Sequence, residues 1–159
     1  MEENIYIQCR KKAAKYDDRL NSRDRAAELL GISESSLTHY ELGITKNIPV
    51  DIIVMMAERY HAPELKYHYC KNECPIGKNL PISPEEKTIE QATVHLLDSL
   101  NNERISRITS KLLHIARDGN VSEQESDELA SIVDELHYVT QAIHELQLIV
   151  EKNTKTGRK

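Results

Sequence analysis

Near its start the chain reads Ala26-Ala27-Glu28-Leu29-Leu30-Gly31-Ile32-Ser33 and continues as Glu34-Ser35-Ser36-Leu37-Thr38-His39-Tyr40-Glu41-Leu42-Gly43. The first part has one apolar helical face, and Gly31 can take the positive φ that ends a helix sharply. Ser33 is a favoured N-cap for a second helix, which would turn Leu37 and Tyr40 inward. The stretch therefore predicts two short helices joined by a tight turn, a helix-turn-helix. From spacing alone, an ordinary αα-hairpin fits equally well.

The second of these helices is expected to leave five side chains outward: Glu34, Ser35, Thr38, His39 and Leu42. In a helix-turn-helix such positions enter the major groove, where hydroxyl groups and an imidazole reach base edges. We therefore predict that Ser35, Thr38 and His39 contact bases and that Ser36 lies nearer the DNA backbone. Glu34 has two interpretations, since it can compensate the helix dipole or accept a bond from cytosine N4.

From Ile5 to about Tyr69 the chain resembles the XRE family of helix-turn-helix regulators, the Cro and repressor type. The resemblance rests on the run from Ala27 to Ser33, on Leu37, on Glu41 with Gly43 after it, and on an apolar helix from Val50 to Tyr60. It implies a five-helix, lambda-repressor-like domain over residues 1–70 that binds double-stranded DNA. It also implies a structural ion pair between Arg10 of the first helix and Glu41.

At the start of the helix before the turn, where a threonine-glutamine pair is common in the family, this chain has Ser22-Arg23. Ser22 can still cap, and a guanidinium at a helix N-terminus suits a phosphate oxygen. Lys46 and Asn47 follow the second helix, in a loop where relatives hold the sugar-phosphate backbone. The expected backbone contacts are therefore Arg23, Ser36, Lys46 and Asn47.

A change of composition separates this domain from the rest of the chain. Residues 71–82 contain Pro75, Gly77 and Pro81 and are predicted to be a linker. Ser83-Pro84 is a strong helix start, and a long helix is expected to run to about Arg117.

Asp118-Gly119-Asn120 should break that helix, and Ser122 with Glu125 should form a capping box for another. The second helix is predicted to end near Lys152. Residues 83–152 thus predict a long antiparallel helical hairpin, followed by a disordered tail at 153–159. The expected fold class is all-α.

Apolar residues of the last helix alternate in steps of three and four, the heptad seam of a coiled coil. They are Leu129, Ile132, Leu136, Val139, Ile143, Leu146 and Val150. Two such helices have more apolar surface than one hairpin hides. We expect a homodimer through residues 84–152 in a four-helix bundle. The alternatives are a fold over the N-terminal domain and a core within one chain.

Composition favours a small soluble regulator. The 159 residues are 39% apolar and 30% charged, with a net charge of −5. Net acidity is unfavourable for DNA binding, but the first two expected helices carry seven cations between Arg10 and Arg25 against three aspartates. No stretch approaches a membrane span, and the N-terminus lacks a signal-like apolar segment, so a cytoplasmic protein is expected.

Neither an enzyme nor a cofactor is expected. A glycine-rich phosphate loop, a nucleophile elbow and a His-Glu-x-x-His motif are all missing from the sequence. Three cysteines, Cys9, Cys70 and Cys74, permit a zinc or redox site only if the fold brings further ligands to them. Buried free thiols and no metal are the default expectation, and the role of these cysteines stays open.

Together these patterns predict a dimeric, sequence-specific transcriptional regulator that reads a two-fold operator through the major groove. The alternative is a protein-interaction module that uses the helix-turn-helix fold and the hairpin as a scaffold and has no DNA affinity. Net acidity and Glu34 support the alternative.

Overall fold

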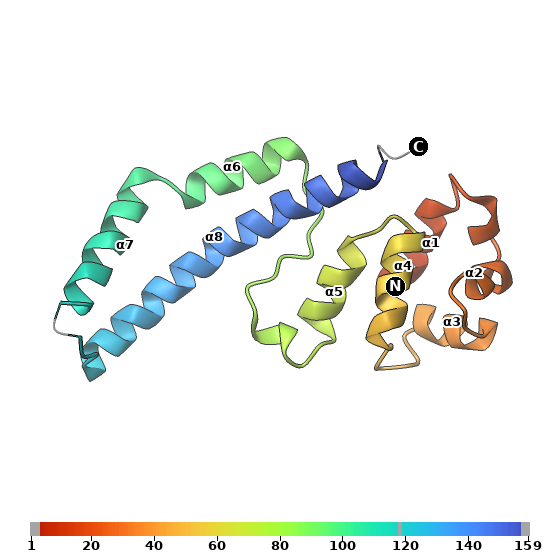
Figure 1. Ribbon diagram of the computed structural model, residues 1–159, viewed down its shortest axis with the longest axis horizontal. Coiled ribbons are helices and arrows are strands. Elements are labelled where there is room, and N and C mark those ends of the chain that lie inside the picture. Colours follow the sequence, from red (N-terminus) through yellow and green to blue (C-terminus); the bar gives the residue numbers. More distant parts are fainter. Residues whose placement is uncertain (1–3, 118, 157–159) are drawn as a thin grey trace. The chain divides into compact units, whose positions relative to one another are not determined.

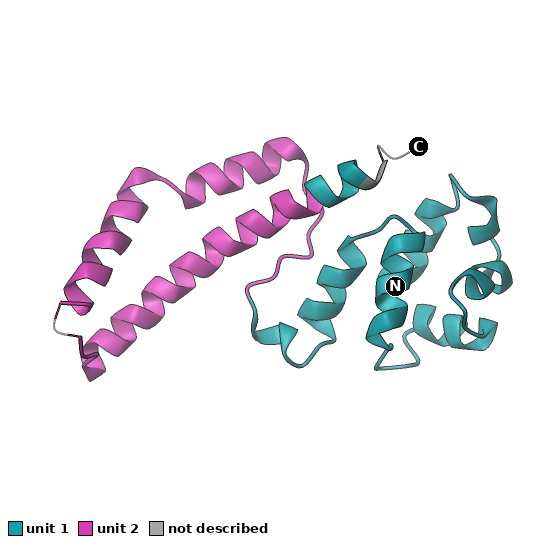
Figure 2. Ribbon diagram, viewed as in Figure 1, with its two compact units in different colours: residues 1–80, 150–159 teal, residues 81–149 magenta. Residues whose placement is uncertain are grey.

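The computed structural model describes residues 4–117 and 119–156. Within these residues every regular element is a helix and there is no strand, which confirms the all-α class (Figure 1). The described residues contain no helix with the length and apolarity needed to span a membrane. Two compact units are present (Figure 2): unit 1 comprises Met1–Leu80 and Val150–Lys159, and unit 2 comprises Pro81–Ile149.

Besides the end of the last helix of the chain, described below, unit 1 contains five α-helices and two short 3-10 helices between residues 4 and 80. They are α1 (Ile5–Ala13), η1 (Asp18–Leu20), α2 (Arg23–Leu29), α3 (Glu34–Glu41), α4 (Val50–Arg59), α5 (Glu64–Asn72) and η2 (Gly77–Asn79). Their shared core includes Leu20, Leu30, Leu37, Met56 and Leu65, each with at most 1% of its surface exposed. Because these side chains come from different elements, the core fixes α2 and α3 against the rest of the unit.

The first unit includes most of the residues expected to be a linker, 71–82. The turn of η2 lies against the end of α5, and a Cβ at Gly77 would stand 2.1 Å from the carbonyl oxygen of Cys70. Only glycine fits there, so Gly77 serves close packing rather than flexibility. Residues 71–80 therefore belong to unit 1, and the boundary lies after Leu80 instead of near residue 70.

A tyrosine also ties the two ends of the N-terminal domain together. The hydroxyl of Tyr6 in α1 donates to Glu73 Oε1, just after α5, at 2.5 Å. Burial, with the bond to Glu73 second, raises the pKa of Tyr6 above its usual range. The phenol stays protonated and keeps its role as a donor.

Unit 2 differs from the expected hairpin in its first arm. That arm consists of two helices, α6 (Ile89–Ser99) and α7 (Asn102–Ile115), instead of one. The Asn101 side chain accepts a bond from Arg104 N at 2.9 Å and so caps a new helix. Asparagine competes well with the helical backbone in this way, which explains the break.

The start of the first arm also lies later than predicted. Thr88 and Gln91 form the capping box of α6, whereas the hydroxyl of Ser83 donates to Glu145 instead of capping. The Ser83 side chain, expected to cap a helix, instead forms a tertiary hydrogen bond to Glu145.

The second arm is α8 (Glu123–Thr156), of which the part up to Ile149 belongs to unit 2. Ser122 and Glu125 form the predicted capping box at its start, with Glu125 N bonded to Ser122 Oγ and Ser122 N bonded to Glu125 Oε2. The helix continues to Thr156, so residues 153–156, expected in a disordered tail, are helical. The predicted break at residues 118–120 lies between the end of α7 and the start of α8, and Gly119 there has φ +75°. Residue 118 itself and the last residues of the tail, 157–159, lie outside the described part.

Candidate nucleic-acid interface

The turn between α2 and α3 is closed by backbone hydrogen bonds of the Schellman type. Gly31 has φ +65°, its N–H donates to Glu28 O, and Ile32 N donates to Ala27 O at 3.0 Å. Ser33 then caps α3, since its Oγ accepts from Ser36 N at 3.0 Å. The turn and the start of α3 are therefore fixed by local bonds.

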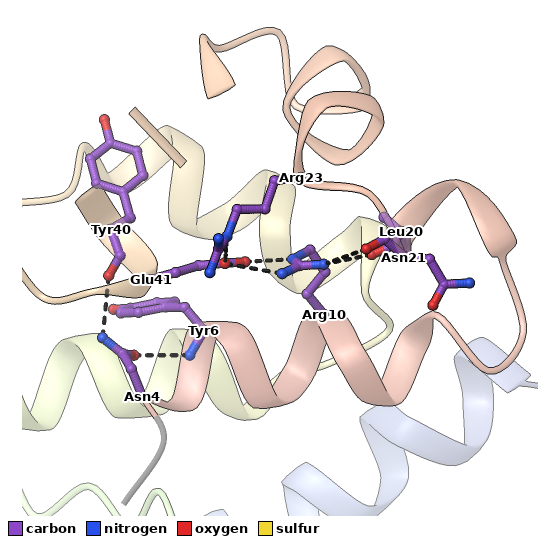
Figure 3. Close-up of polar contacts among 8 residues, drawn as sticks. All are labelled: Asn4, Tyr6, Arg10, Leu20, Asn21, Arg23, Tyr40 and Glu41. Atoms are coloured by element: carbon purple, nitrogen blue, oxygen red, sulfur yellow. Dashed lines mark hydrogen bonds and ion pairs between the residues drawn. The ribbon is translucent and has the colours of Figure 1, made fainter. Parts of the chain in front are cut away.

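The other end of α3 is fixed in the same way. Gly43 has φ +68°, and Ile44 N donates to His39 O at 2.9 Å. In addition, the Asn4 side chain donates to the carbonyl oxygen of Tyr40 at 3.2 Å (Figure 3). Hydrogen bonds thus fix both ends of the eight-residue helix α3.

The outward face of α3 carries the residues expected to contact bases. Ser35 and His39 are exposed, and Thr38 is half-buried, while Leu37 and Glu41 are buried on the opposite side. Ser36 is half-buried and its hydroxyl is hydrogen-bonded to that of Ser33 at 2.8 Å. Ser35, Thr38 and His39 thus reach solvent on this face, whereas the Ser36 hydroxyl is bonded to the capping residue Ser33.

Leu42 extends this face. It follows α3, lies one helical turn beyond Thr38 and has 59% of its surface exposed. A leucine in this place is an apolar neighbour for the polar side chains of the face. Lys46 and Asn47, both exposed, lie in the loop that follows.

The predicted partners Arg10 and Glu41 lie together in the interior of unit 1. The guanidinium of Arg10 forms two bonds to the Glu41 carboxylate, and its Nη1 also donates to Leu20 O at 2.8 Å and Asn21 O at 3.3 Å (Figure 3). The Glu41 side chain has no exposed surface. One arginine thus joins α1, the segment before α2, and the end of α3.

Arg23, expected to contact the DNA backbone, is bonded to the protein through one of its donors and is partly exposed to solvent. Its Nε donates to Glu41 Oε2 at 2.7 Å, so Glu41 accepts from two arginines. Because 35% of its side chain is exposed, Arg23 also meets solvent at the start of α2. Two guanidinium groups against one carboxylate leave a net positive charge of one at this helix N-terminus. The resemblance to the XRE family implied only the partnership with Arg10, and no sequence pattern indicated that Arg23 shares the same acceptor.

Ser22 and Ser33 both occupy N-cap positions, but only Ser33 forms a capping bond with its side chain, and this difference leads to a prediction. Replacing Ser33 with alanine is expected to lower the free energy of unfolding by about 1 kcal/mol, because Ser36 N loses its acceptor. Ser22 occupies the N-cap of α2 but makes no capping bond with its side chain. Ser22→Ala is therefore the matched control, with an expected change below about 0.5 kcal/mol. Urea unfolding of both variants measures the difference, and equal losses would contradict the role given to Ser33.

The three cysteines are unbridged and do not converge on a metal-binding cluster. Cys9 is buried, whereas Cys70 and Cys74 are half-buried at the end of α5. Burial, with Cys74 second, raises the pKa of the Cys70 thiol. Within residues 4–117 and 119–156 no group of three or more His, Cys, Asp or Glu is arranged to hold a metal ion.

Comparison of the chain with protein-family models, with curated proteins and with solved structures finds no match.

Proposed function

We propose that this protein is a sequence-specific DNA-binding transcriptional regulator in which α2 and α3 form a helix-turn-helix of the XRE type. One observation carries the proposal: α3 is held at both ends and turns short polar side chains, Ser35, Thr38 and His39, to solvent. A helix presented in this way enters the major groove, and hydroxyl and imidazole groups reach base edges there. Leu42 supplies an apolar contact suited to a thymine methyl group.

Cations at the edges of this face hold the phosphate backbone in the proposed complex. Lys46 is exposed in the loop after α3, beside the amide of Asn47. Arg23 uses its Nε for Glu41, and the other donors of its exposed guanidinium suit a phosphate oxygen. Because the whole chain is acidic, each copy makes few phosphate contacts, so binding of two copies to a two-fold operator supplies the affinity.

The proposal is tested first by selecting binding sequences from a random duplex pool with the purified protein. We expect enrichment of a palindrome with half-sites about one helical turn apart. Affinity for the selected duplex should exceed that for a scrambled duplex and fall steeply with salt. Absence of enrichment at low salt would contradict DNA binding.

Two kinds of substitution then separate backbone contacts from base contacts. Lys46→Ala is expected to weaken binding to all duplexes and to reduce the salt slope by about one. Thr38→Ala or His39→Ala is expected to relax preference at individual base pairs, at a cost of about 1–3 kcal/mol each. Lys78→Ala, an equal charge change at an exposed lysine of η2, is the control and should leave both properties unchanged. The same loss from Lys46→Ala and Lys78→Ala would contradict the docking.

A second candidate function, a protein-interaction module, has one observation in its favour. Leu42, Ile44 and Val50 are about 60% exposed around the end of α3 and the start of α4. Exposed apolar side chains gathered in this way are typical of protein-binding surfaces. The duplex selection distinguishes the two functions, because an interaction module enriches no sequence.

A further inference from the structure

We propose that a second copy of this chain covers the apolar side of unit 2, through what is here called the open face. The open face consists of Leu100, at the end of α6, Ile105 and Leu112 of α7, and Val133, Leu136 and Ile143 of α8. Each of these six side chains has between 36% and 43% of its surface exposed. The inference deepens the proposed function, since a two-fold operator requires two copies, but it stands on unit 2 alone.

The heptad seam of α8 is divided between the inside of the unit and its surface. Ile132 is buried in a small core with Ile108 and Ile115 of α7. Leu136 and Ile143, from the same seam, are exposed instead. Ile132 is thus covered within unit 2, whereas Leu136 and Ile143 of the same seam keep about 40% of their surface exposed.

The exposed side of α8 forms a regular seam of its own. Val133, Leu136, Thr140 and Ile143 follow one another at steps of three and four, the spacing by which one helix packs into another. Thr140 is the polar member, and its hydroxyl already donates to Leu136 O at 3.0 Å. A satisfied hydroxyl can be covered by an apolar partner without losing a bond to water.

Charged side chains lie on the opposite edge of the α7 and α8 pair. There Arg107 bonds to Glu135 at 2.6 Å and Lys111 to Glu128 at 3.1 Å. Helical geometry places Ile105 and Leu112 on the flank of α7 away from these two cations. Two identical open faces therefore meet without like charges at their seam positions.

The size of the open face also agrees with a second copy as the occupant. Its six side chains expose on the order of 400 Å² of apolar surface, as much as the largest patch on a typical monomer. Homodimer interfaces are roughly 65% apolar, so two copies with a polar rim would bury about 1,200 Å² in total. That area is the lower limit of a stable interface. Helices with the same heptad spacing pack against each other. A second copy provides such a helix, and in a two-fold dimer the same residues of both copies form the interface.

The test is the mass of the full chain by sedimentation velocity over a micromolar concentration series. We expect the wild type to sediment as a dimer of the 18.2 kDa chain. The double variant Leu136→Lys, Ile143→Lys should be monomeric with unchanged helical circular dichroism. Val94→Lys with Leu113→Lys is the matched control, because these side chains are more exposed, at 67% and 68%, and lie outside the open face. The control should remain dimeric.

If lysine at these positions unfolds the chain, the milder pair Leu136→Gln, Ile143→Gln is expected to raise the dimer dissociation constant at least tenfold. A monomeric wild type would overturn the inference, since another partner or another part of the chain would then cover the open face. A dimer that survives both open-face variants would overturn it as well. These measurements use no DNA, so failure of the dimer and failure of the duplex selection are separate results.

Discussion

Replacing Glu41 with glutamine is expected to lower the free energy of unfolding of unit 1 by about 3–5 kcal/mol. The Glu41 carboxylate is fully buried and accepts bonds from Arg10 and from Arg23. Its removal takes away the carboxylate that the guanidinium of Arg10, itself 5% exposed, faces in the interior. Removing one partner of a buried ion pair is far more costly than the loss of an exposed ion pair.

Urea or thermal unfolding of the full chain measures this loss, with the circular dichroism of the helices as the signal. The matched control is Asp17→Asn, the same carboxylate-to-amide change in an exposed ion pair with Arg19. Its expected cost is far smaller, because an exposed ion pair contributes little to stability. Comparable losses in the two variants would show that the Glu41 network contributes no more than a surface pair.

The same network determines which cation is the better probe of DNA binding. Because Arg23 is bonded to Glu41, its replacement changes both the stability of unit 1 and any phosphate contact. Lys46 is exposed in a loop, so its replacement reports on the phosphate contact with little structural effect. For this reason the binding test relies on Lys46 and leaves Arg23 intact.

The parts of the fold that follow from local chemistry were predictable from the sequence. The turn at Gly31 and the cap at Ser33 depend on residues within one or two helical turns, and the structure contains both. The Ser122 and Glu125 capping box is local too. By contrast, Ser83 is an equally good cap by sequence, but Glu145, far along the chain, takes its hydroxyl. Tertiary partners of this kind leave no local signal.

Two further differences between the sequence prediction and the structure also depend on contacts that leave no clear signal in the sequence. The break at Asn101 was missed because the apolar stripe continues on both sides of it, from Leu100 to Ile105, while the cap depends on a single side chain. The heptad of α8 predicted one seam, whereas α7 covers only part of it and leaves Leu136 and Ile143 exposed. Periodicity identifies apolar positions, but the packing of the neighbouring helices decides which are covered.

Unit 2 has a buried carboxylate of its own, which no sequence pattern indicated. Glu145 is 2% exposed and accepts bonds from Lys87 Nζ at 2.8 Å, from His95 Nδ1 at 2.7 Å and from Ser83 Oγ at 3.1 Å. The ring of Tyr138 lies edge-on to His95, with centroids 4.4 Å apart. Through these bonds α8 holds both α6 and the segment that leads into it.

Glu145→Gln is therefore expected to destabilise unit 2 by about 3 kcal/mol at neutral pH, since it removes the charge that Lys87 and His95 face. Burial by itself would raise the pKa of Glu145, but the bonds from His95 and Lys87 outweigh it and the pKa is lowered. The Glu145 contribution to stability is thus fully present above the ordinary glutamate pKa. It is lost as the pH falls through the lowered value of the folded state.

Unfolding free energies of the wild type and Glu145→Gln, measured from about pH 7 to about pH 3, should accordingly converge toward the acid end of the range. Glu128→Gln makes the same change on the same helix, in a half-exposed pair with Lys111, and should cost less than about 1 kcal/mol throughout. A constant gap between the wild type and Glu145→Gln would mean that the charge of Glu145 does not carry the stabilisation. Convergence of the two curves is thus the result that assigns the stabilisation to the charge, since glutamine retains the shape of the side chain.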